Sequence, residues 1–573
     1  GRSFWAEIKR IRSCGRGNSR IVDNCTNEQD IATMFADKYH DLYTSVPFDA
    51  KVMQGIAAEV EAHVTCDSAS DLIITPSDVC YAVRQIKGNK TDGEFCLNSN
   101  HFLHADNDLS VYLSFVFTAM VVHDLVPDSF LFNTILPIPK GKNSNVSDSS
   151  NYRGVALSPI YGKIFDHIVI AKYCTKLCTS ELQFGFKRNS STNMCTMILK
   201  EAMAYYHRHN SSVFCTFLDA SKAFDRVNYC KLFRLLVDRG LPSSVVRILM
   251  KFYTERRIRV SWGGLFSDCF TALNGVGQGG VLSPVLFCVY VDNLLEILRK
   301  AGIGCFIGLN FVGALAYADD IVLIAPTVSA MRKMLAICDA YATEFDIKFN
   351  AQKSACLVCP ASNRRYLHSI NNISKFSVGG EDIEFVESYT HLGHIINSQL
   401  NDTEDISHRR NLFIGQLNSV LCFFNDLDSL VKVQLFKAYC SSLYGSVLWS
   451  LDSRSIIDMC STWRAALRRI FGLPSNAHRF LLPLLSDTLP LSDELVKRCC
   501  KFSLSCLFNS SLLVRSVAWH AISVARYASP FGKNVLFCCG YYNWSVGAFL
   551  AGEVNMSDGF FAAIFINKLT EIR

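Results

Sequence analysis

Three aspartates stand at points where apolar stretches of the sequence end. Asp319 and Asp320 interrupt the stretch LAYADDIVLIA, and Asp219 directly follows the apolar run VFCTFL. Carboxylates are rarely left in such surroundings without a partner, because burying an unpaired charge is costly. Transfer of a nucleotidyl group to a 3′-hydroxyl uses two divalent ions held by carboxylates. We therefore predict that Asp219 and Asp319 bridge two Mg²⁺ ions, for which Mn²⁺ is a substitute, and that Asp320 assists one ion or tunes the site.

A structural alternative for the same residues stays open. Asp319 and Asp320 could form the tip of a turn, and Asp219 could cap a helix. An apolar run, two acids and a second apolar run are typical of a β-hairpin, in which neighbouring side chains point to opposite faces. The two acids therefore need not share a role. Asp219 favours the metal interpretation, because one sheet would then supply three carboxylates.

The elements that must position these acids are strands with helices between them. Residues 206–395 contain the densest strand signals, among them SVFCTFLDA, RIRVSW and ACLVC, and helical patterns such as VLSPVLFCVYVDNLLEILRK separate them. This alternation predicts an α+β fold built on a sheet with helices packed against it. Beyond about residue 396 the pattern is helical.

A glycine-rich segment, GVGQGG at residues 275–280, matches the dinucleotide-binding pattern G-x-G-x-x-G. That pattern also needs an acidic residue about 20 positions further on and a βαβ repeat, and this sequence has neither. A different interpretation starts from Gln278, whose amide could donate to a base or sugar edge. The glycines around it allow the backbone to approach a ligand closely.

The composition indicates a reduced, intracellular protein with more than one core. The chain has 573 residues, a net charge of +6 and 24 scattered cysteines, some of them adjacent. Such spacing does not predict a disulfide framework, and the C-x-x-C at Cys356 and Cys359 lacks a second pair at zinc-finger spacing. The charge permits a polyanionic partner without requiring one.

No association with a membrane is expected. Two uncharged stretches, Cys269 to Val291 and Ala301 to Ala318, are long enough to suggest spans. Polar residues and proline interrupt the first, and the second contains four glycines and runs directly into Asp319. Buried core is the better interpretation of both stretches.

Taken together, several motifs give the chain a family resemblance. FLDASKAFDRV, GVGQGGVLSP and YADD look like palm motifs, and ILPIPK, NYRGVALSPIYGKIFDHIV and ELQFGFKRNSST look like fingers motifs. FNAQKS and YTHLG resemble the two motifs that follow, and SLYGSVLW is similar to a thumb signature. In this order they resemble the reverse transcriptase of non-LTR (LINE-type) retrotransposons, over roughly residues 80 to 475. The resemblance implies a right-hand polymerase with fingers, a palm with an antiparallel sheet, and a helical thumb.

The resemblance also implies four catalytic residues. Asp219, Asp319 and Asp320 match the metal-binding triad of the family. Lys353 matches a lysine that protonates the leaving pyrophosphate, and its alternative interpretation is a solvated surface residue. Gly154 departs from the family, which has proline at this position, so the loop is expected to be less rigid.

Other positions match residues that bind substrate. The residues implied to bind the nucleotide are Lys140, Arg153, Phe224, Gln278 and Gly279. Lys140 and Arg153 would clamp the triphosphate, for which a guanidinium fork suits the phosphate oxygens. The ring of Phe224 would exclude a ribose 2′-OH and favour dNTPs, and ordinary core packing is its alternative. Leu392 and Gly393 lie where the family grips the primer end.

The resemblance divides the chain into successive segments. They are an N-terminal extension (1–60), mainly fingers (61–205), palm with fingers insertions (206–395), a helical thumb (396–500) and a C-terminal appendage of unknown role (501–573). The basic stretch at the start of the chain and the thumb would hold the template–primer, largely through phosphate contacts.

The predicted function is RNA-directed DNA polymerisation in the cytoplasm and nucleus. The implied partners are a template RNA, a primer DNA at a target-site 3′ end and dNTPs, used in target-primed reverse transcription. Endonuclease activity is expected from elsewhere in a longer polypeptide. One alternative is a catalytically silent nucleic-acid-binding relic with the same fold, which the intact acids disfavour. A second is an RNA-dependent RNA polymerase, against which Phe224 and the Ala318-Asp-Asp context argue.

Overall fold

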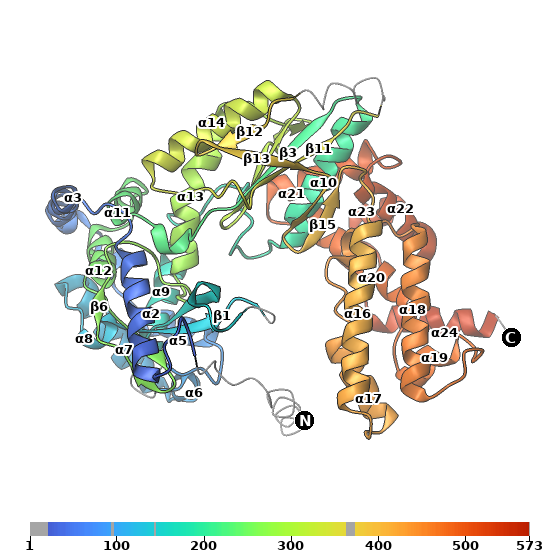
Figure 1. Cartoon of the computed structure of the whole chain (residues 1–573), viewed down its shortest axis with the longest axis horizontal. Coiled ribbons are helices and arrows are strands. Elements are labelled where there is room, and N and C mark those ends of the chain that lie inside the picture. Colours follow the sequence, from blue (N-terminus) through green and yellow to red (C-terminus); the bar gives the residue numbers. More distant parts are fainter. Residues whose placement is uncertain (1–20, 93–96, 142–144, 363–372, 572–573) are drawn as a thin grey trace. The chain divides into compact units, whose positions relative to one another are not determined.

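The computed structural model describes residues 21–92, 97–141, 145–362 and 373–571 (Figure 1). The chain forms two compact units. Unit 1 comprises residues up to 179, 221–293 and 341–348, and unit 2 comprises 180–220, 294–340 and the chain from 349 onward. Neither unit is one continuous segment, and the division into successive segments by role stays a prediction. The basic stretch before residue 21 lies outside the described residues.

Unit 1 contains a five-stranded sheet and the helices around it. The sheet has the order β2-β1-β4-β5, with β6 paired to β4. Its strands are β1 (Phe132–Pro139), β2 (Tyr152–Leu157), β4 (Arg257–Trp262), β5 (Leu265–Phe266) and β6 (Phe270–Thr271). Its helices are α2 (Glu28–Tyr43), α3 (Ala50–His63), α4 (Ala69–Leu72), α5 (Pro76–Gln85), α6 (Ser99–Leu103), α7 (Asn107–His123), α8 (Asp128–Leu131), α9 (Ile160–Lys172), α11 (Tyr229–Asp238) and α12 (Ser243–Thr254).

Helix α2 shows how this sheet is covered. Asn27 caps its N-terminus by accepting a hydrogen bond from the backbone N–H of Gln29. Apolar residues then recur at helical spacing on one face, which is the pattern of a helix packed on a sheet. Phe35 from that face meets Tyr152 of β2 edge-on, with ring centroids 5.2 Å apart. This cluster holds β2 and the loops that follow it in place.

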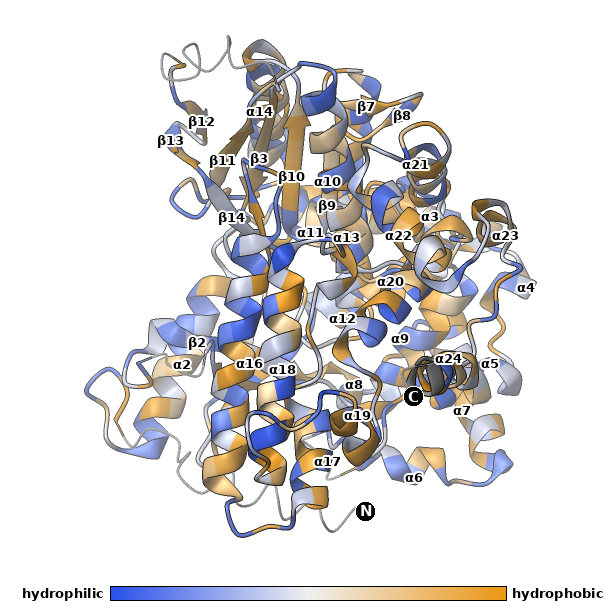
Figure 2. Ribbon diagram, turned by 90° about the vertical axis from the view of Figure 1, so that its right-hand side faces the viewer, coloured by the Kyte–Doolittle hydropathy of each residue, from blue (hydrophilic) through white to orange (hydrophobic). Residues whose placement is uncertain are grey.

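Unit 2 contains the sheet that carries the predicted catalytic acids. The strand order is β12-β13-β11-β3-β10-β9. The strands are β3 (Val213–Leu218), β9 (Ala314–Tyr317), β10 (Asp320–Ala325), β11 (Ala355–Cys359), β12 (Phe376–Val378) and β13 (Glu381–Val386). All six residues of β3 are buried, as its continuous apolar run predicts, and in β10 the five apolar residues after Asp320 are buried as well (Figure 2). The α+β fold with an antiparallel palm sheet is confirmed, except that β11 and β13 pair in parallel.

The rest of unit 2 is mainly helical. Two short hairpins join β7 (Phe306–Ile307) to β8 (Asn310–Phe311) and β14 (Ser388–His391) to β15 (His394–Asn397). The helices are α10 (Thr192–Arg208), α16 (Thr403–Phe423), α17 (Ser429–Tyr439), α18 (Arg454–Phe471), α19 (Leu481–Ser486), α20 (Leu491–Leu507), α21 (Leu512–Ser523), α22 (Pro530–Tyr542), α23 (Val546–Ala551) and α24 (Asp558–Glu571). Helices α13 (Ser283–Lys300) and α14 (Val328–Glu344) each have residues in both units.

The predicted thumb and C-terminal helices are amphipathic and packed. Hydrophilic and hydrophobic residues alternate along α16 and α18 at helical spacing (Figure 2). On α18 the buried face includes Met459, Trp463 and Leu467, and the helix ends at Gly472 with a φ of 61°. Helices α21 and α22 contact α10. The chain after residue 500 is therefore integrated into unit 2 and does not form a loose tail.

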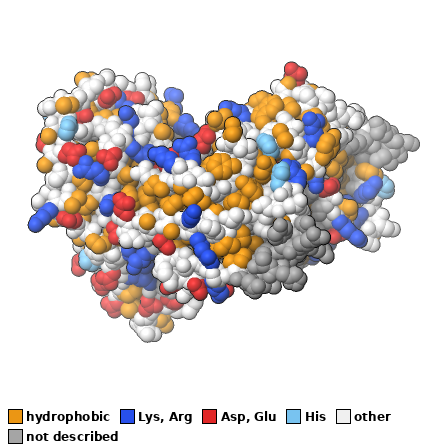
Figure 3. Space-filling model, turned by 90° about the horizontal axis from the view of Figure 1, so that it is seen from above, with side chains coloured by type: hydrophobic (Ala, Val, Ile, Leu, Met, Phe, Trp, Pro, Cys, Tyr) orange, Lys and Arg blue, Asp and Glu red, His pale blue; other side chains and the backbone are white. Residues whose placement is uncertain are grey.

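Three observations on the described residues concern surface charge, thiols and helix hydropathy. On the face shown in Figure 3, basic side chains are interspersed with acidic and hydrophobic ones. Every described cysteine is free, and burial raises the pKa of both Cys356 and Cys359 to about 12, which disfavours them as metal ligands. Within the described ranges, no helix has both the length and the hydropathy needed to cross a membrane.

Candidate active site

The three predicted metal-binding acids lie at one end of the sheet of unit 2. Strands β3 and β10 are antiparallel neighbours, with Leu218 opposite Ile321. Asp219, which follows β3, and Asp320, which begins β10, therefore lie at the same end of the ladder. Strands β9 and β10 form the predicted hairpin, and Asp319 stands in its turn. The topology thus brings together carboxylates that are about a hundred residues apart in the sequence.

A buried glutamine, Gln183, hydrogen-bonds to the turn that carries Asp319. Ala318 has a φ of 58°, a conformation that a non-glycine residue adopts only when its surroundings enforce it. Gln183 Oε1 accepts hydrogen bonds from the backbone N–H groups of Ala318 and Gly185, each at 2.8 Å. A Cβ on Gly185 would lie 2.5 Å from the nitrogen of Ala318. Glycine at 185 is therefore required for this close approach.

A second loop fixes Asp219 and brings Lys353 to it. The backbone oxygen of Asp219 accepts from the N–H of Asn350 at 2.8 Å, and its N–H donates to Ser354 Oγ at 3.2 Å. Lys353 Nζ lies 3.8 Å from Asp219 Oδ2. The FNAQKS segment therefore both positions the first acid and supplies a cation beside it.

The electrostatics of this end of the sheet favour a cation. Partial burial, followed by the charges of Asp319 and Asp219, raises the pKa of Asp320 to about 6. Among the described residues, no three His, Cys, Asp or Glu side chains are grouped to hold a metal ion by themselves. Mg²⁺ does not need such a group, because it is usually bound by one or two carboxylates together with water and substrate phosphates. The residues present therefore fit Mg²⁺ ions that arrive with a nucleotide.

Unit 1 holds the residues predicted to select the nucleotide. Phe224 stands at the start of a short 3₁₀ helix (Phe224–Arg226), five residues after Asp219 in the chain. It is half-buried, and its ring stacks on that of Phe287 with centroids 4.6 Å apart. The packing contact and the partial exposure are compatible with both interpretations of this ring.

Gln278 is anchored by an acid that the sequence had not singled out. Its Nε2 donates to Asp225 Oδ2 at 2.8 Å, and the Tyr43 hydroxyl donates to Asp225 Oδ1 at 3.2 Å. Burial raises the pKa of Asp225 to about 6, although these two hydrogen bonds oppose the rise. The signal was an acid directly after Phe224 in the motif FLDASKAFDRV.

The glycine loop docks on strand β2. The carbonyl of Gln278 accepts from the N–H of Ala156 at 2.7 Å. Gly279 has a φ of 110°, and a Cβ there would lie 2.8 Å from the oxygen of Ala156. Both the backbone angle and the close contact exclude a side chain at 279.

Lys140 and Arg153 come from adjacent strands of unit 1. Arg153 lies opposite Ile138 in the β1–β2 pair and is exposed, and Lys140 directly follows β1 and donates from Nζ to the carbonyl of Ser150 at 2.8 Å. The expectation of a less rigid loop at Gly154 is wrong, because Gly154 lies within β2. A Cβ there would lie 2.9 Å from the Tyr39 ring, so glycine makes room for α2.

The predicted primer-binding residues form a turn in unit 2. Leu392 and Gly393 connect β14 to β15, with φ values of 49° and 76°. Unit 2 therefore holds the four predicted catalytic residues and this turn. Unit 1 holds the five residues predicted to bind the nucleotide.

This arrangement defines a class of enzyme. A buried strand that ends in one aspartate, paired with a hairpin that carries two more, is the palm of a template-directed nucleotidyltransferase. Residues 138–396 match the family described as reverse transcriptase (RNA-dependent DNA polymerase). This part of the chain is therefore similar to a reverse transcriptase domain.

Related proteins agree with the predicted resemblance to non-LTR retrotransposon polymerases, which is confirmed. The chain is 22% identical over 499 residues to the RNA-directed DNA polymerase from mobile element jockey of Drosophila funebris, covering 82% of this chain and 52% of that protein. It is 24% identical over 301 residues to the Pol polyprotein from retrotransposable element R2 of Nasonia vitripennis, covering 51% and 28%. The chain spans about half the length of the first of these relatives.

Among solved structures, apo telomerase from Candida tropicalis is similar with a TM-score of 0.36 and 13% identity. The match covers 76% of this chain and 72% of that one.

Proposed function

We propose that this chain is an RNA-directed DNA polymerase that adds dNTPs to a primer 3′-OH. The observation that carries the proposal is the meeting of Asp219, Asp319 and Asp320 at one end of a palm sheet, with Lys353 against Asp219. The proposal concerns polymerisation alone, because the match covers only 52% of the jockey polymerase.

Carboxylates of this chain would bind the divalent cations that the reaction needs. Asp219 and Asp319 would hold two Mg²⁺ ions, and Asp320, whose pKa is raised by burial and then by the other two acids, would assist one of them. When bound, such ions lower the pKa of the primer hydroxyl and stabilise charge on the leaving pyrophosphate. Lys353, 3.8 Å from Asp219, would give its proton to that leaving group.

The nucleotide would be selected by the residues of unit 1. Arg153 and Lys140 would bind the triphosphate, because Arg153 is a cation on β2 and Lys140 is a cation that directly follows the neighbouring strand β1. The half-exposed ring of Phe224 would exclude a ribose 2′-OH by contact. Gln278, held by Asp225, would present its amide in one fixed orientation rather than sampling several.

The partners follow from this chemistry. A template RNA and a primer DNA taken from a target-site 3′ end would occupy the site, with endonuclease activity supplied elsewhere in a longer polypeptide. Reverse transcription at a chromosomal target would require the protein in the nucleus after synthesis in the cytoplasm.

One assay tests this function. The chain is incubated with an RNA template, an annealed DNA primer, Mg²⁺ and either dNTPs or NTPs, and the primer is followed on a denaturing gel. We expect extension with dNTPs only. Extension with NTPs alone would identify an RNA polymerase. Tight template binding with no extension under Mg²⁺ or Mn²⁺ would contradict the proposal and would indicate a catalytically inactive nucleic-acid-binding protein.

A further inference from the structure

The SLYGSVLW segment, Ser442 to Trp449, has no role in the proposed function although it resembles a thumb signature. It follows α17 in unit 2 and includes a short 3₁₀ helix (Ser446–Leu448). Tyr444 of the segment contacts the β14–β15 hairpin, whose turn is Leu392 and Gly393. Two sets of contacts surround the hairpin, one at its turn and one beside His394 and Ile395, the first residues of β15.

At the tip, both turn carbonyls are bound by side chains. The hydroxyl of Tyr444 donates to the carbonyl of Leu392 at 2.9 Å and lies 2.6 Å from Thr192 Oγ1 on α10. Arg409 of α16 donates to the carbonyl of Gly393, and its guanidinium lies 5.3 Å from the centroid of the Tyr444 ring. Both turn residues have positive φ, which is unfavourable for a leucine, so the turn needs such support.

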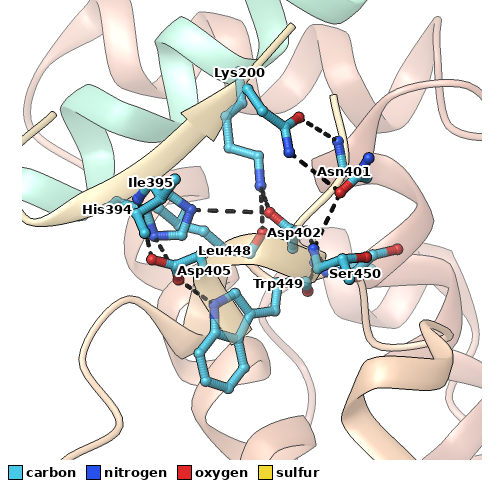
Figure 4. Close-up of polar contacts among 12 residues, drawn as sticks. Lys200, His394, Ile395, Asn401, Asp402, Asp405, Leu448, Trp449 and Ser450 are labelled. Carbon is cyan, nitrogen blue, oxygen red and sulfur yellow. Dashed lines mark hydrogen bonds and ion pairs between the residues drawn. The ribbon is translucent and has the colours of Figure 1, made fainter. Parts of the chain in front are cut away.

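At the start of β15, directly after the turn, His394 is almost completely buried beside two acids (Figure 4). Its Nδ1 lies 3.3 Å from Asp405 Oδ2. Asp405 also accepts from the N–H of Ile395 at 3.0 Å and from Trp449 Nε1 at 2.7 Å. The last residue of the SLYGSVLW segment therefore binds the same carboxylate that holds the backbone of β15.

The second acid, Asp402, connects this part of the hairpin and the SLYGSVLW segment to helix α10 through Lys200. Lys200 Nζ donates to Asp402 Oδ1 at 2.6 Å and to the carbonyl of Leu448 at 2.8 Å (Figure 4). The N–H of Ser450 donates to Asp402 Oδ2 at 2.9 Å. A Cβ on Gly445 would lie 2.8 Å from His394 Nδ1, so the glycine of the segment makes room for the histidine.

The hairpin also packs on β3, the strand that directly precedes Asp219. Tyr389 stacks on Phe217 with centroids 4.3 Å apart, and the ring of His391 lies 5.1 Å from it. Phe217 is two residues before Asp219 in the chain. A continuous series of contacts thus runs from the strand of the first acid, through the hairpin, to the SLYGSVLW segment.

We propose that the SLYGSVLW segment is a clasp that fixes the Leu392–Gly393 turn relative to Asp219, with Tyr444 as a positioning residue for the primer end. This inference rests on the proposed function, since a primer 3′-OH must stay in line with the nucleotide for transfer to occur. Tyr444 touches neither substrate nor metal in this role. It acts through the carbonyl of Leu392.

The test compares Tyr444→Phe with Tyr527→Phe, a matched control on an exposed tyrosine of the same unit. The first substitution removes only the hydroxyl and keeps the ring beside Arg409. We expect the single-turnover rate of the first dNTP addition, at saturating primer–template and dNTP, to fall about tenfold in Tyr444→Phe. Primer–template affinity and melting temperature should stay at wild-type values, and the control should match wild type in all three.

A second readout does not depend on activity. Amide hydrogen exchange in residues 388–397 should become about tenfold faster in Tyr444→Phe than in wild type or Tyr527→Phe. Unchanged exchange and an unchanged rate overturn the clasp while leaving the proposed function intact. A rate that falls only in proportion to a lost folded fraction also overturns it, because the role would be structural. If wild type does not extend primers, the proposed function fails, and the exchange result still decides whether Tyr444 holds the turn.

Discussion

Two acids with the same raised pKa occupy different surroundings in the two units. In unit 1, burial raises the pKa of Asp225 to about 6, against hydrogen bonds from Tyr43 and Gln278. In unit 2, burial raises the pKa of Asp320 to about 6, and the neighbouring Asp319 and Asp219 raise it further. The neighbours of Asp225 favour its charge, whereas the neighbours of Asp320 oppose it.

This difference distinguishes Asp225, an acid with a structural role, from Asp320, an acid whose surroundings favour the binding of a cation. The Asp225 carboxylate already accepts two hydrogen bonds, and a further cation would displace the donors that orient Gln278. The carboxylates at the end of the palm sheet repel one another, so bound divalent cations would lower the energy of that site. A shifted pKa by itself does not distinguish the two cases, and the identity of the neighbours does.

The sharpest way to break the comparison is to remove one charge from each unit. Asp319→Asn should lower primer extension about a thousandfold or more, because losing metal-assisted charge stabilisation costs several kcal/mol in the transition state. Asp225→Asn should keep extension within about tenfold of wild type, since the amide oxygen still accepts from Tyr43.

Extension rates under Mg²⁺ and equilibrium template binding measure both variants. Asp458→Asn, on the exposed face of α18, is the matched control. Near-wild-type extension by Asp319→Asn would refute the metal assignment. A loss in Asp225→Asn as large as that in Asp319→Asn would erase the distinction between the two acids.

A third acid extends the comparison to a buried ion pair. Burial opposes the ionisation of Asp402, yet Lys200 and hydrogen bonds outweigh it and hold the pKa well below its usual range. Lys200→Met should lower the free energy of unfolding by about 3–5 kcal/mol, because it leaves a buried carboxylate without its cation.

Urea denaturation measures this loss, with Lys437→Met as the control. Lys437 pairs with the fully exposed Asp487 at 4.0 Å, and losing that pair should cost less than about 1 kcal/mol. Equal effects of the two substitutions would mean that the partner of Asp402 does not stabilise the fold.

A smaller predicted effect is the pH dependence of the free energy of unfolding, which tests Asp225 alone. The pKa of Asp225 is about 6 in the folded protein and near its usual value of about 4 when unfolded. Between these values the folded state binds the extra proton, so stability falls as pH rises through this window and is level above it. The fall is on the order of 3 kcal/mol and should be missing in Asp225→Asn. Urea midpoints of both proteins from pH 4.5 to 7 measure it, and a constant difference between them would contradict the raised pKa.

Local sequence patterns predict the elements and the acids well. The continuous apolar run before Asp219 predicts a buried strand, and the two acids between apolar runs predict the hairpin. Both are short-range signals, because strand burial and hairpin formation depend on neighbours within a few residues. The palm and the choice of Lys353 follow from the family resemblance of the motifs, whereas the 3.8 Å approach of Lys353 Nζ to Asp219 Oδ2 is seen only in the structure.

The supports of the site are not predictable in the same way. Gln183 reaches Ala318 across 135 positions, and Lys200 reaches Asp402 across 202. No periodicity identifies the partner of a buried polar side chain, since the choice is made by the packing of distant elements. The prediction of a less rigid loop at Gly154 is wrong for the same reason. Glycine is required at this position because of Tyr39, which lies on a helix distant in the sequence.

The smallest predicted effect concerns the ring next to the structural acid. Phe224 packs on Phe287 in unit 1 and is only half-buried, and its proposed role is to exclude a ribose 2′-OH. Phe224→Ala should raise ribonucleotide incorporation relative to dNTPs about tenfold, because steric discrimination of one small group is worth about 1–3 kcal/mol. Competition between each dNTP and its NTP in single-nucleotide extension measures the ratio.

Phe287→Leu serves as the control, because it removes the packing partner and leaves the Phe224 ring in place. If Phe224→Ala lowers stability as Phe287→Leu does and leaves sugar selectivity unchanged, the ring belongs to the core, and nucleotide choice must be made by other residues of unit 1.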